Sequence, residues 1–144
     1  ADATIFFFFL IKRMNLDVEY ELIAFMLQSP SPGVVAILCL FVNPELSAIL
    51  KSISHKETEI CITIEREFLK TLEGGCTAPI GAKAELIGSQ IRFVGRLCSL
   101  DGKNCIETDE IFDWNESENF GAKLALKVLE NGGKELMDEI RKSL

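Results

Sequence analysis

The stretch FLKTLEGGCTAPIGAKAEL, residues 68–86, contains the junction on which the fold depends. Its first part continues a helical pattern and its last part begins a strand-like segment, with two glycines, a cysteine and a proline between them. Glycine commonly ends helices because it adopts left-handed backbone angles without a Cβ clash. We therefore expect a helix that ends at Gly74 and Gly75, followed by a loop that displays the thiol of Cys76.

The helix before this junction is predicted to begin near Ser54, where the sequence SHKE has the Ser-x-x-Glu form of a capping box. His55 is then expected to be a solvated neighbour of the cap rather than a catalyst. Apolar residues recur at every fourth position of this helix and form one stripe that faces the core, at Ile60, Ile64, Phe68 and Leu72. A shorter helix is predicted from Asn43, because asparagine is a good N-cap and the proline after it suits a first helical turn.

Three strand-like segments follow, at 82–88, 90–100 and 104–112. The pairs Gly88-Ser89 and Asp101-Gly102 between them are tight-turn signals, so the plain inference is an antiparallel meander. In the middle segment Ile91 and Phe93 alternate with Arg92, Val94 and Arg96, which indicates one buried and one wetter face. The simplest interpretation of Arg92 and Arg96 is that they lie on a solvated face of the sheet without a binding role. The alternative is that they form a site for a phosphate or carboxylate.

The last part of the chain reads as two helices. Asn115 is the expected cap, an amphipathic helix runs to about Glu130, and glycines at 132 and 133 separate it from a closing helix. The acidic sequence DWNESE is explained by capping and helix-dipole stabilisation, with a metal role as the alternative. Residues 43–144 are therefore predicted to form an α+β domain, a three-stranded antiparallel sheet with helices packed on one face.

Residues 1–42 have a different pattern. The continuous apolar runs at 3–10 and 33–42 are predicted to be buried strands, separated by a loop at QSPSPG. Two strands do not make a stable sheet alone, so we interpret this portion as the strand-rich remnant of a preceding α/β domain. The nine residues of the N-terminal stretch ATIFFFFLI, 3–11, fall well short of the roughly 20 that cross a bilayer, so no membrane partner is expected.

The net charge and the cysteines of the chain exclude several classes of function. The 144 residues carry a net charge of −7, which argues against nucleic acid as a partner. The five cysteines are widely spaced and include no Cys-x-x-Cys pair, so neither a disulfide framework nor a zinc site is indicated. No metal is therefore expected. A cytoplasmic location fits this cysteine usage best. Cys39, Cys61 and Cys98 are expected in the core, and Cys105 is expected to be exposed or half-buried without a role.

The sequences EREFLKTLEGGCTAPIGAKAEL and SLDGKNCIETDE resemble the C-terminal part of the hydroxymethylbilane synthase family, also called the porphobilinogen deaminases. The signature is long, mixed in residue type and ungapped. The resemblance implies a transferase that polymerises four porphobilinogen units into hydroxymethylbilane, in tetrapyrrole and haem biosynthesis. It also implies that Cys76 carries a dipyrromethane cofactor through a thioether, while Gly74 and Gly75 give the loop its freedom.

Two earlier segments resemble the family more faintly. The sequence DATIFFFFLIKRMNL departs from the family pattern at the phenylalanines of 6–9, and MLQSPSPGVVAILC departs at Pro32. Large aromatic side chains do not simply replace alanines in a packed site, and proline removes a backbone donor. The contacts that the family makes through these segments are therefore not carried over to this chain.

The resemblance covers only part of the family's length, because the whole enzyme is about twice as long. The catalytic aspartate and most of the arginines that bind the growing pyrrole chain belong to the N-terminal half. No catalytic residue is expected in this chain, which alone should be inactive and should work with N-terminal domains of the same enzyme. Two alternatives are a non-catalytic α+β module that binds a metabolite or protein, and a thiol redox protein, for which no resolving cysteine lies near Cys76.

Overall fold

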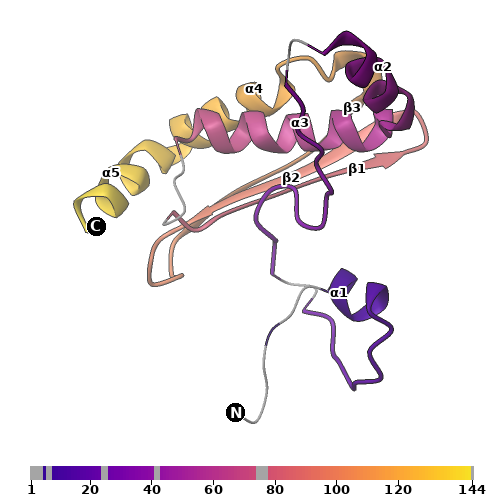
Figure 1. Cartoon of the computed structure of the whole chain (residues 1–144). Coiled ribbons are helices and arrows are strands. Elements are labelled where there is room, and N and C mark those ends of the chain that lie inside the picture. Colours follow the sequence, from indigo (N-terminus) through magenta and orange to yellow (C-terminus); the bar gives the residue numbers. More distant parts are fainter. Residues whose placement is uncertain (1–4, 6–7, 24–25, 41–42, 74–77, 144) are drawn as a thin grey trace.

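The computed structural model describes residues 5, 8–23, 26–40, 43–73 and 78–143 (Figure 1). Along these residues the helices are α1 (Phe8–Arg13), α2 (Pro44–Ile53), α3 (Lys56–Thr71), α4 (Phe120–Val128) and α5 (Lys134–Lys142), and the strands are β1 (Ile80–Ile87), β2 (Gln90–Cys98) and β3 (Cys105–Asp113). In the described part of the chain, no helix is both long and apolar enough to cross a membrane.

The three strands form the predicted antiparallel meander, in the order β1-β2-β3. Ile87 pairs with Gln90 across the first turn, and Cys98 pairs with Cys105 across the second. Gly88 and Gly102 have φ angles of 64° and 70°, the left-handed conformation that glycine adopts at no steric cost. The two turn signals in the sequence therefore fix the register of the sheet.

Helices α3 and α4 lie side by side over one face of the sheet, and α5 continues beyond α4 (Figure 1). The predicted stripe on α3 is buried at Ile64, Phe68 and Leu72, each at most 1% exposed, and Ile60 is partly buried against the core. From the sheet, Phe93 meets Phe68 with ring centroids 5.1 Å apart. The fold is the expected α+β class, with its core between the helices and one sheet face.

Helices α3 and α4 can approach each other closely because of one glycine. A Cβ atom at Gly121 of α4 would lie 2.0 Å from the carbonyl oxygen of Ile64 in α3 and 2.9 Å from the Cβ of Glu67. No side chain fits in that space, so glycine sets the spacing of α3 and α4. Between α4 and α5, Asn131 and Gly132 have non-helical angles, which confirms the predicted glycine break.

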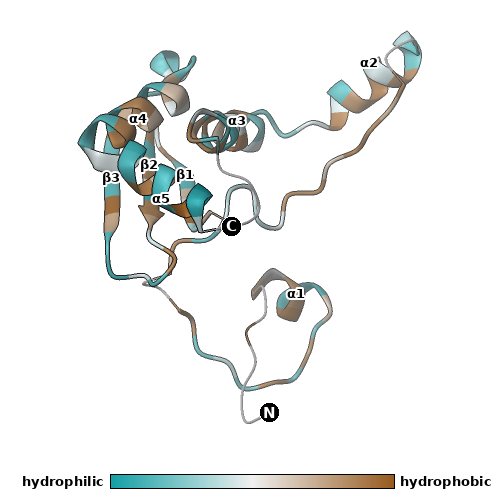
Figure 2. Cartoon of the chain, turned by 90° about the vertical axis from the view of Figure 1, so that its left-hand side faces the viewer, coloured by the Kyte–Doolittle hydropathy of each residue, from teal (hydrophilic) through white to brown (hydrophobic). Residues whose placement is uncertain are grey.

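The predicted strands of the N-terminal portion are absent from its described residues, and that expectation was wrong. Residues 8–13 form helix α1, and residues 33–40 are extended without pairing in a sheet. A helix satisfies its backbone groups locally, as when the Met14 N–H donates to the Leu10 carbonyl, whereas a strand needs a neighbour. Figure 2 shows the second run as a brown, apolar ribbon leading to α2, and its side chains Val35, Ile37 and Leu38 are exposed.

The start of α3 also differs from the prediction. The expected capping box at Ser54 does not form, because the Ser54 N–H donates to the Lys51 carbonyl and closes the end of α2. His55 is the N-cap instead, and its Nδ1 accepts a hydrogen bond of 3.3 Å from the Thr58 N–H. Only two residues separate the helices, and Ser54 caps the end of α2 while His55 caps the start of α3.

The cap predicted at Asn115 was likewise wrong. Asp113 caps a short 3-10 turn, Trp114–Glu116, by accepting a hydrogen bond of 2.8 Å from the Asn115 N–H. Helix α4 begins only at Phe120, after Asn119 in the left-handed conformation. The capping role expected for the acidic sequence is thus filled by Asp113. It caps the short 3-10 turn, which ends before helix α4 begins.

Candidate functional site

The three site residues singled out in the sequence, Gly74, Gly75 and Cys76, lie outside the described residues, in the gap 74–77. We call residues 74–77 the Cys76 segment. The structure describes the residues on either side of it, up to Glu73 and from Ala78 onward. It therefore shows how the segment is attached to the domain, and it leaves the predicted loop and displayed thiol as predictions.

The end that precedes the Cys76 segment is anchored by α3. Leu72, which caps α3, is 1% exposed, so the core holds the last turn in place. Glu73 then takes a φ of 53°, and its carboxylate accepts a hydrogen bond of 2.7 Å from the Arg141 guanidinium of α5. This ion pair joins residues 68 positions apart, although its exposure to solvent limits its contribution to stability.

The end that follows the segment is anchored by the sheet. The Pro79 carbonyl accepts a hydrogen bond of 3.0 Å from the backbone N–H of Cys98, at the last position of β2. Ile80, the next residue, pairs with Leu97. The Cys76 segment therefore connects α3 to β1 in the sequence, and the described start of β1 lies next to the end of β2.

Two cysteines that were expected to have no role are joined at that end of the hairpin. Cys98 and Cys105 form a disulfide, so the expectation of no disulfide and of a core position for Cys98 was wrong. The two residues are direct register partners on β2 and β3. The signal was present in the sequence, because both cysteines are equally distant from the turn at Asp101-Gly102, and residues placed symmetrically about a hairpin turn face one another.

The other two cysteines in the described residues are free. Cys39 is exposed, contrary to the core position expected for it, because the strand predicted around it does not form. Cys61 is half-buried beside the core, as expected. Burial raises the pKa of the Cys61 thiol, and the neighbouring Glu65 carboxylate raises it further. A thiol with a raised pKa is a poor nucleophile at neutral pH, so Cys61 has the properties of a structural residue.

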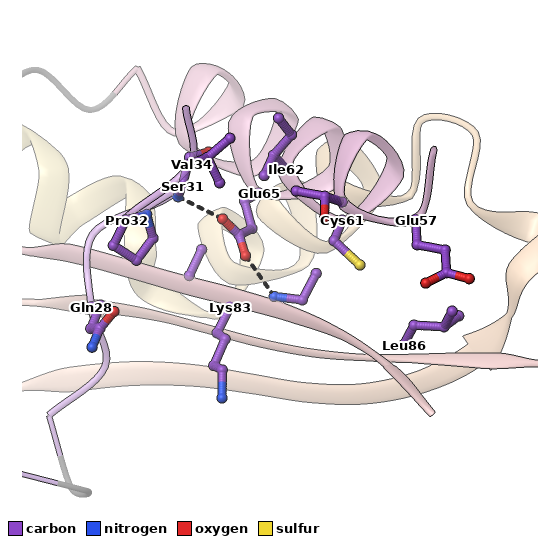
Figure 3. Close-up of a pocket in the computed structure, with 13 residues that line it drawn as sticks. Gln28, Ser31, Pro32, Val34, Glu57, Cys61, Ile62, Glu65, Lys83 and Leu86 are labelled. Carbon is purple, nitrogen blue, oxygen red and sulfur yellow. Dashed lines mark hydrogen bonds between the residues drawn. The ribbon is translucent and has the colours of Figure 1, made fainter. Parts of the chain in front are cut away.

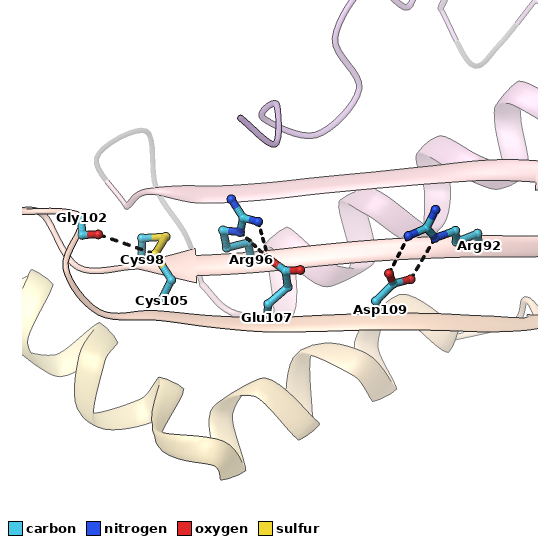
Figure 4. A network of polar contacts seen from close by, with 7 residues as sticks. All are labelled: Arg92, Arg96, Cys98, Gly102, Cys105, Glu107 and Asp109. Atoms are coloured by element: carbon cyan, nitrogen blue, oxygen red, sulfur yellow. Dashed lines mark hydrogen bonds and ion pairs between the residues drawn. A yellow bond between two sulfur atoms is a disulfide. The ribbon is translucent and has the colours of Figure 1, made fainter. Parts of the chain in front are cut away.

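The uncovered face of the sheet carries paired charges (Figure 4). Arg92 donates two hydrogen bonds to Asp109, of 3.0 and 2.7 Å, and Arg96 pairs with Glu107. The hydrogen bond from Arg92 lowers the pKa of Asp109. These pairs support the interpretation of a solvated sheet face, because both guanidinium groups already have carboxylate partners on the neighbouring strand.

A groove of about 370 Å³ lies between α3, β1 and residues 27–34, which we call the strap (Figure 3). Glu65, only 5% exposed, stands between the helix and the strand. One carboxylate oxygen accepts the Ser31 N–H of the strap at 2.6 Å, and the other accepts the Ala84 N–H of β1 at 2.8 Å. Burial raises the pKa of Glu65, although the two N–H donors favour the charged form.

This carboxylate is the residue that sequence reasoning missed. Glu65 belongs to the quoted signature, but its position on a helix with many surface acids gave no sign of burial. Its neighbour Ile64 marks the core stripe, so a position next to the stripe and facing the sheet edge was the available signal. Across the described ranges, no cluster of three or more His, Cys, Asp or Glu side chains could hold a metal ion.

Comparison with protein families finds one domain in this chain. Residues 59–130 match the model of the porphobilinogen deaminase C-terminal domain. The match includes α3 from residue 59 on, the Cys76 segment, the whole sheet and α4. It therefore covers the part of the molecule in which the predicted fold was confirmed.

Curated relatives agree with this match. The chain is 33% identical to the porphobilinogen deaminase of Desulforamulus reducens, over 91% of this chain and 43% of that protein. It is 34% identical to the porphobilinogen deaminase of a Nostoc species, over 79% of this chain and 35% of that protein. The chain spans less than half the length of these relatives.

Proposed function

The chain belongs to the porphobilinogen deaminase family, and from this premise we propose that it is the C-terminal part of such an enzyme. The proposed whole enzyme is hydroxymethylbilane synthase, a transferase that releases ammonia as it joins four porphobilinogen units. Its product serves porphyrin and haem biosynthesis. The observation that carries the proposal is the match over residues 59–130, which contains the Gly-Gly-Cys sequence at 74–76.

Within that enzyme we assign Cys76 the role of anchor for a dipyrromethane cofactor. A thioether needs one thiol, and Cys76 supplies it in a segment held at one end by Leu72 and at the other by Pro79. When bound, dipyrromethane supplies the pyrrole to which the substrate units are joined. An anchor on a segment with fixed ends keeps the bound group close to one place, so later encounters become intramolecular.

The growing pyrrole chain carries carboxylates, which need cationic partners close to the Cys76 segment. Arg141 is the cation paired at the preceding end of the Cys76 segment, and it already contacts Glu73 and Asp138. The carboxylates of the growing chain would therefore depend on arginines of the N-terminal half, as would acid–base catalysis. We accordingly propose that the chain alone does not turn over porphobilinogen.

The exposed apolar residues support a partner for residues 1–42. Apart from α2, the domain of residues 43–144 buries most of its large apolar side chains, whereas Val35, Ile37, Leu38 and Leu40 are between 59% and 94% exposed. We propose that residues 1–42 complete a preceding domain of the enzyme and that residues 43–144 form the cofactor-carrying domain. An exposed apolar stretch of this size is typical of an interface.

A cytoplasmic location remains part of the proposal. Cytoplasmic thiols are kept reduced by glutathione and thioredoxin, so Cys98 and Cys105 would be a dithiol there and a disulfide under oxidising conditions. The proposed anchoring chemistry is independent of this pair, because it uses only the thiol of Cys76.

The experiment joins this chain to the N-terminal half of the Desulforamulus reducens enzyme and measures hydroxymethylbilane formation from porphobilinogen. We expect turnover by the joined protein and none by the 144-residue chain. Cys76→Ser should abolish turnover, while the matched control Cys39→Ser, at an exposed cysteine, should retain it.

Two results would contradict the proposal. Equal turnover by Cys76→Ser and the unchanged joined protein would remove the anchor role. A joined protein that folds but forms no product, although the relative's own two halves do so when joined in the same way, would favour the alternative of a non-catalytic binding module.

A further inference from the structure

The outer edge of β1 is closed by two different acceptors. Strand β1 lies at one side of the sheet, so its outward N–H groups have no strand partner within the meander. The Ala82 N–H donates to the Gln28 carbonyl of the strap at 3.0 Å, and the Ala84 N–H donates to the Glu65 carboxylate at 2.8 Å. The strap thus pairs with the edge at one position, and helix α3 supplies a side chain for the next.

Glu65 is placed where the strap turns away from the edge. A second strand would offer β1 another carbonyl two residues on, and the carboxylate occupies that place (Figure 3). Its other oxygen holds the strap itself, through the Ser31 N–H. Pro30 and Pro32 on either side have no N–H, so the Ser31 N–H is the one backbone donor that this Pro-Ser-Pro sequence can offer.

The strap has a second contact with the same strand. Gly81 of β1 lies against Leu27, since a Cβ atom at Gly81 would be 2.9 Å from the Leu27 carbonyl oxygen and 3.0 Å from its side chain. Ser31 itself has a φ of 60°, a conformation that costs a residue with a side chain some free energy. Contacts at Leu27 and at Ser31 therefore hold the first half of the strap against the domain.

We propose that Glu65 is a positioning residue that docks the strap on the edge of β1 and so fixes the place where the preceding portion of the polypeptide enters the Cys76-carrying domain. The consequence for catalysis rests on the proposed function, but the docking itself is a property of this chain. Losing a hydrogen bond to a charged group typically changes an opening equilibrium by about ten-fold or more.

The test is amide hydrogen exchange of the 144-residue chain, resolved by residue. In the unchanged chain we expect Ser31 to be the most protected amide of the strap, well above Ser29 and Gly33. In Glu65→Gln, which keeps one acceptor oxygen but introduces an N–H₂ group among N–H donors, Ser31 should exchange about ten-fold faster or more. Glu59→Gln, on the exposed side of the same helix, is the matched control and should leave Ser31 unchanged.

A pH series separates docking by the carboxylate from a general loss of structure. The charged or titratable groups that face Glu65 are Arg66 and Cys61 from α3 and Lys83 from β1, and residues 26–38 contain none. In the unchanged chain, the exchange rate of the Ser31 amide should deviate from the simple base-catalysed dependence on pH at mildly acidic pH, where the Glu65 carboxylate becomes protonated. This deviation should be absent in Glu65→Gln.

The proposal is overturned if Ser31 exchanges as fast as Ser29 in the unchanged chain, a result that needs no variant to fold. It is also overturned if Glu65→Gln leaves Ser31 protected, or if the pH departure persists in that variant. None of these outcomes depends on enzymatic turnover, so failure of the docking and failure of the proposed function are distinguishable.

Discussion

The packed region, residues 56–73 and 78–143, and the described residues of the segment 5–40 are both rich in apolar side chains, yet they use them differently. In the domain, apolar residues recur with the period of a helix or a strand and meet one another in one core. In the segment they form continuous runs, and the side chains of Val35, Ile37 and Leu38 are mostly exposed. Apolar content alone therefore does not create a core, because burial requires a period that places side chains on a shared face.

The strap marks the boundary between the two regions. Leu27 and Ser31 contact the domain, whereas the residues that follow, up to residue 40, are largely exposed. The attachment is mostly polar, through Gln28 and Glu65, and it uses the edge of the sheet rather than the core. The segment is therefore fixed at one short stretch and otherwise makes little use of its apolar residues in the described structure.

The largest expected difference between the regions comes from truncating one apolar side chain in each. Phe68→Ala removes a fully buried ring and should lower the free energy of unfolding by about 3–5 kcal/mol. Leu38→Ala, at a residue 94% exposed, should change it by less than about 0.5 kcal/mol. Denaturant unfolding measures both, and similar losses for the two variants would refute the division into a packed domain and an unpacked segment.

The next largest effect tests the helix contact in the domain. Gly121→Ala places a Cβ atom against the Ile64 carbonyl, so α3 and α4 must separate, and overpacking of this kind costs about 1–3 kcal/mol or more. Gly88→Asn is the control, since its turn has open space and asparagine tolerates the left-handed conformation. If thermal unfolding shows equal stability for both variants, glycine does not set the helix spacing.

Reduction of the Cys98–Cys105 disulfide should have a smaller effect. The bond closes a loop with a sequence separation of 7, for which chain entropy gives about 2.4 kcal/mol. Hydrogen bonds across the turn, such as the one from the Ser99 N–H to the Asn104 carbonyl, already constrain this loop and should reduce the loss below that value. Denaturant unfolding with and without a thiol reductant measures the loss, and the Cys98→Ser/Cys105→Ser double variant should not respond to the reductant. A loss well above the entropic value would show that the hairpin depends on the disulfide.

The sheet could be predicted because its signals are local. Turn residues at Gly88 and Gly102 and the alternation around Phe93 lie within a few positions of the contacts that they determine. The same locality explains the disulfide, which follows from symmetry about one turn. The prediction missed it because cysteine spacing was considered without the register of the hairpin.

Other features could not be read from short patterns. The apolar runs at 3–10 and 33–42 indicate burial, but they do not show whether a neighbouring strand is present. The predicted strands did not form in the residues described. Ser54 matched a capping box, but the preceding helix used it as a C-cap. Glu65 depends on the strap and β1, which lie 34 and 19 residues away, and no local pattern reports such a contact. Cys76 was identified by family resemblance rather than by any property of the loop.

The most direct test of the account is the mass of the protein at Cys76. The joined protein, with the N-terminal half of the Desulforamulus reducens enzyme, is purified after exposure to porphobilinogen and analysed by intact mass and peptide mapping. The account predicts an adduct of two pyrrole units on the peptide that contains Cys76, and its absence in Cys76→Ser. An unmodified Cys76 in a joined protein that forms hydroxymethylbilane, or an adduct on Cys39 or Cys61, would contradict it.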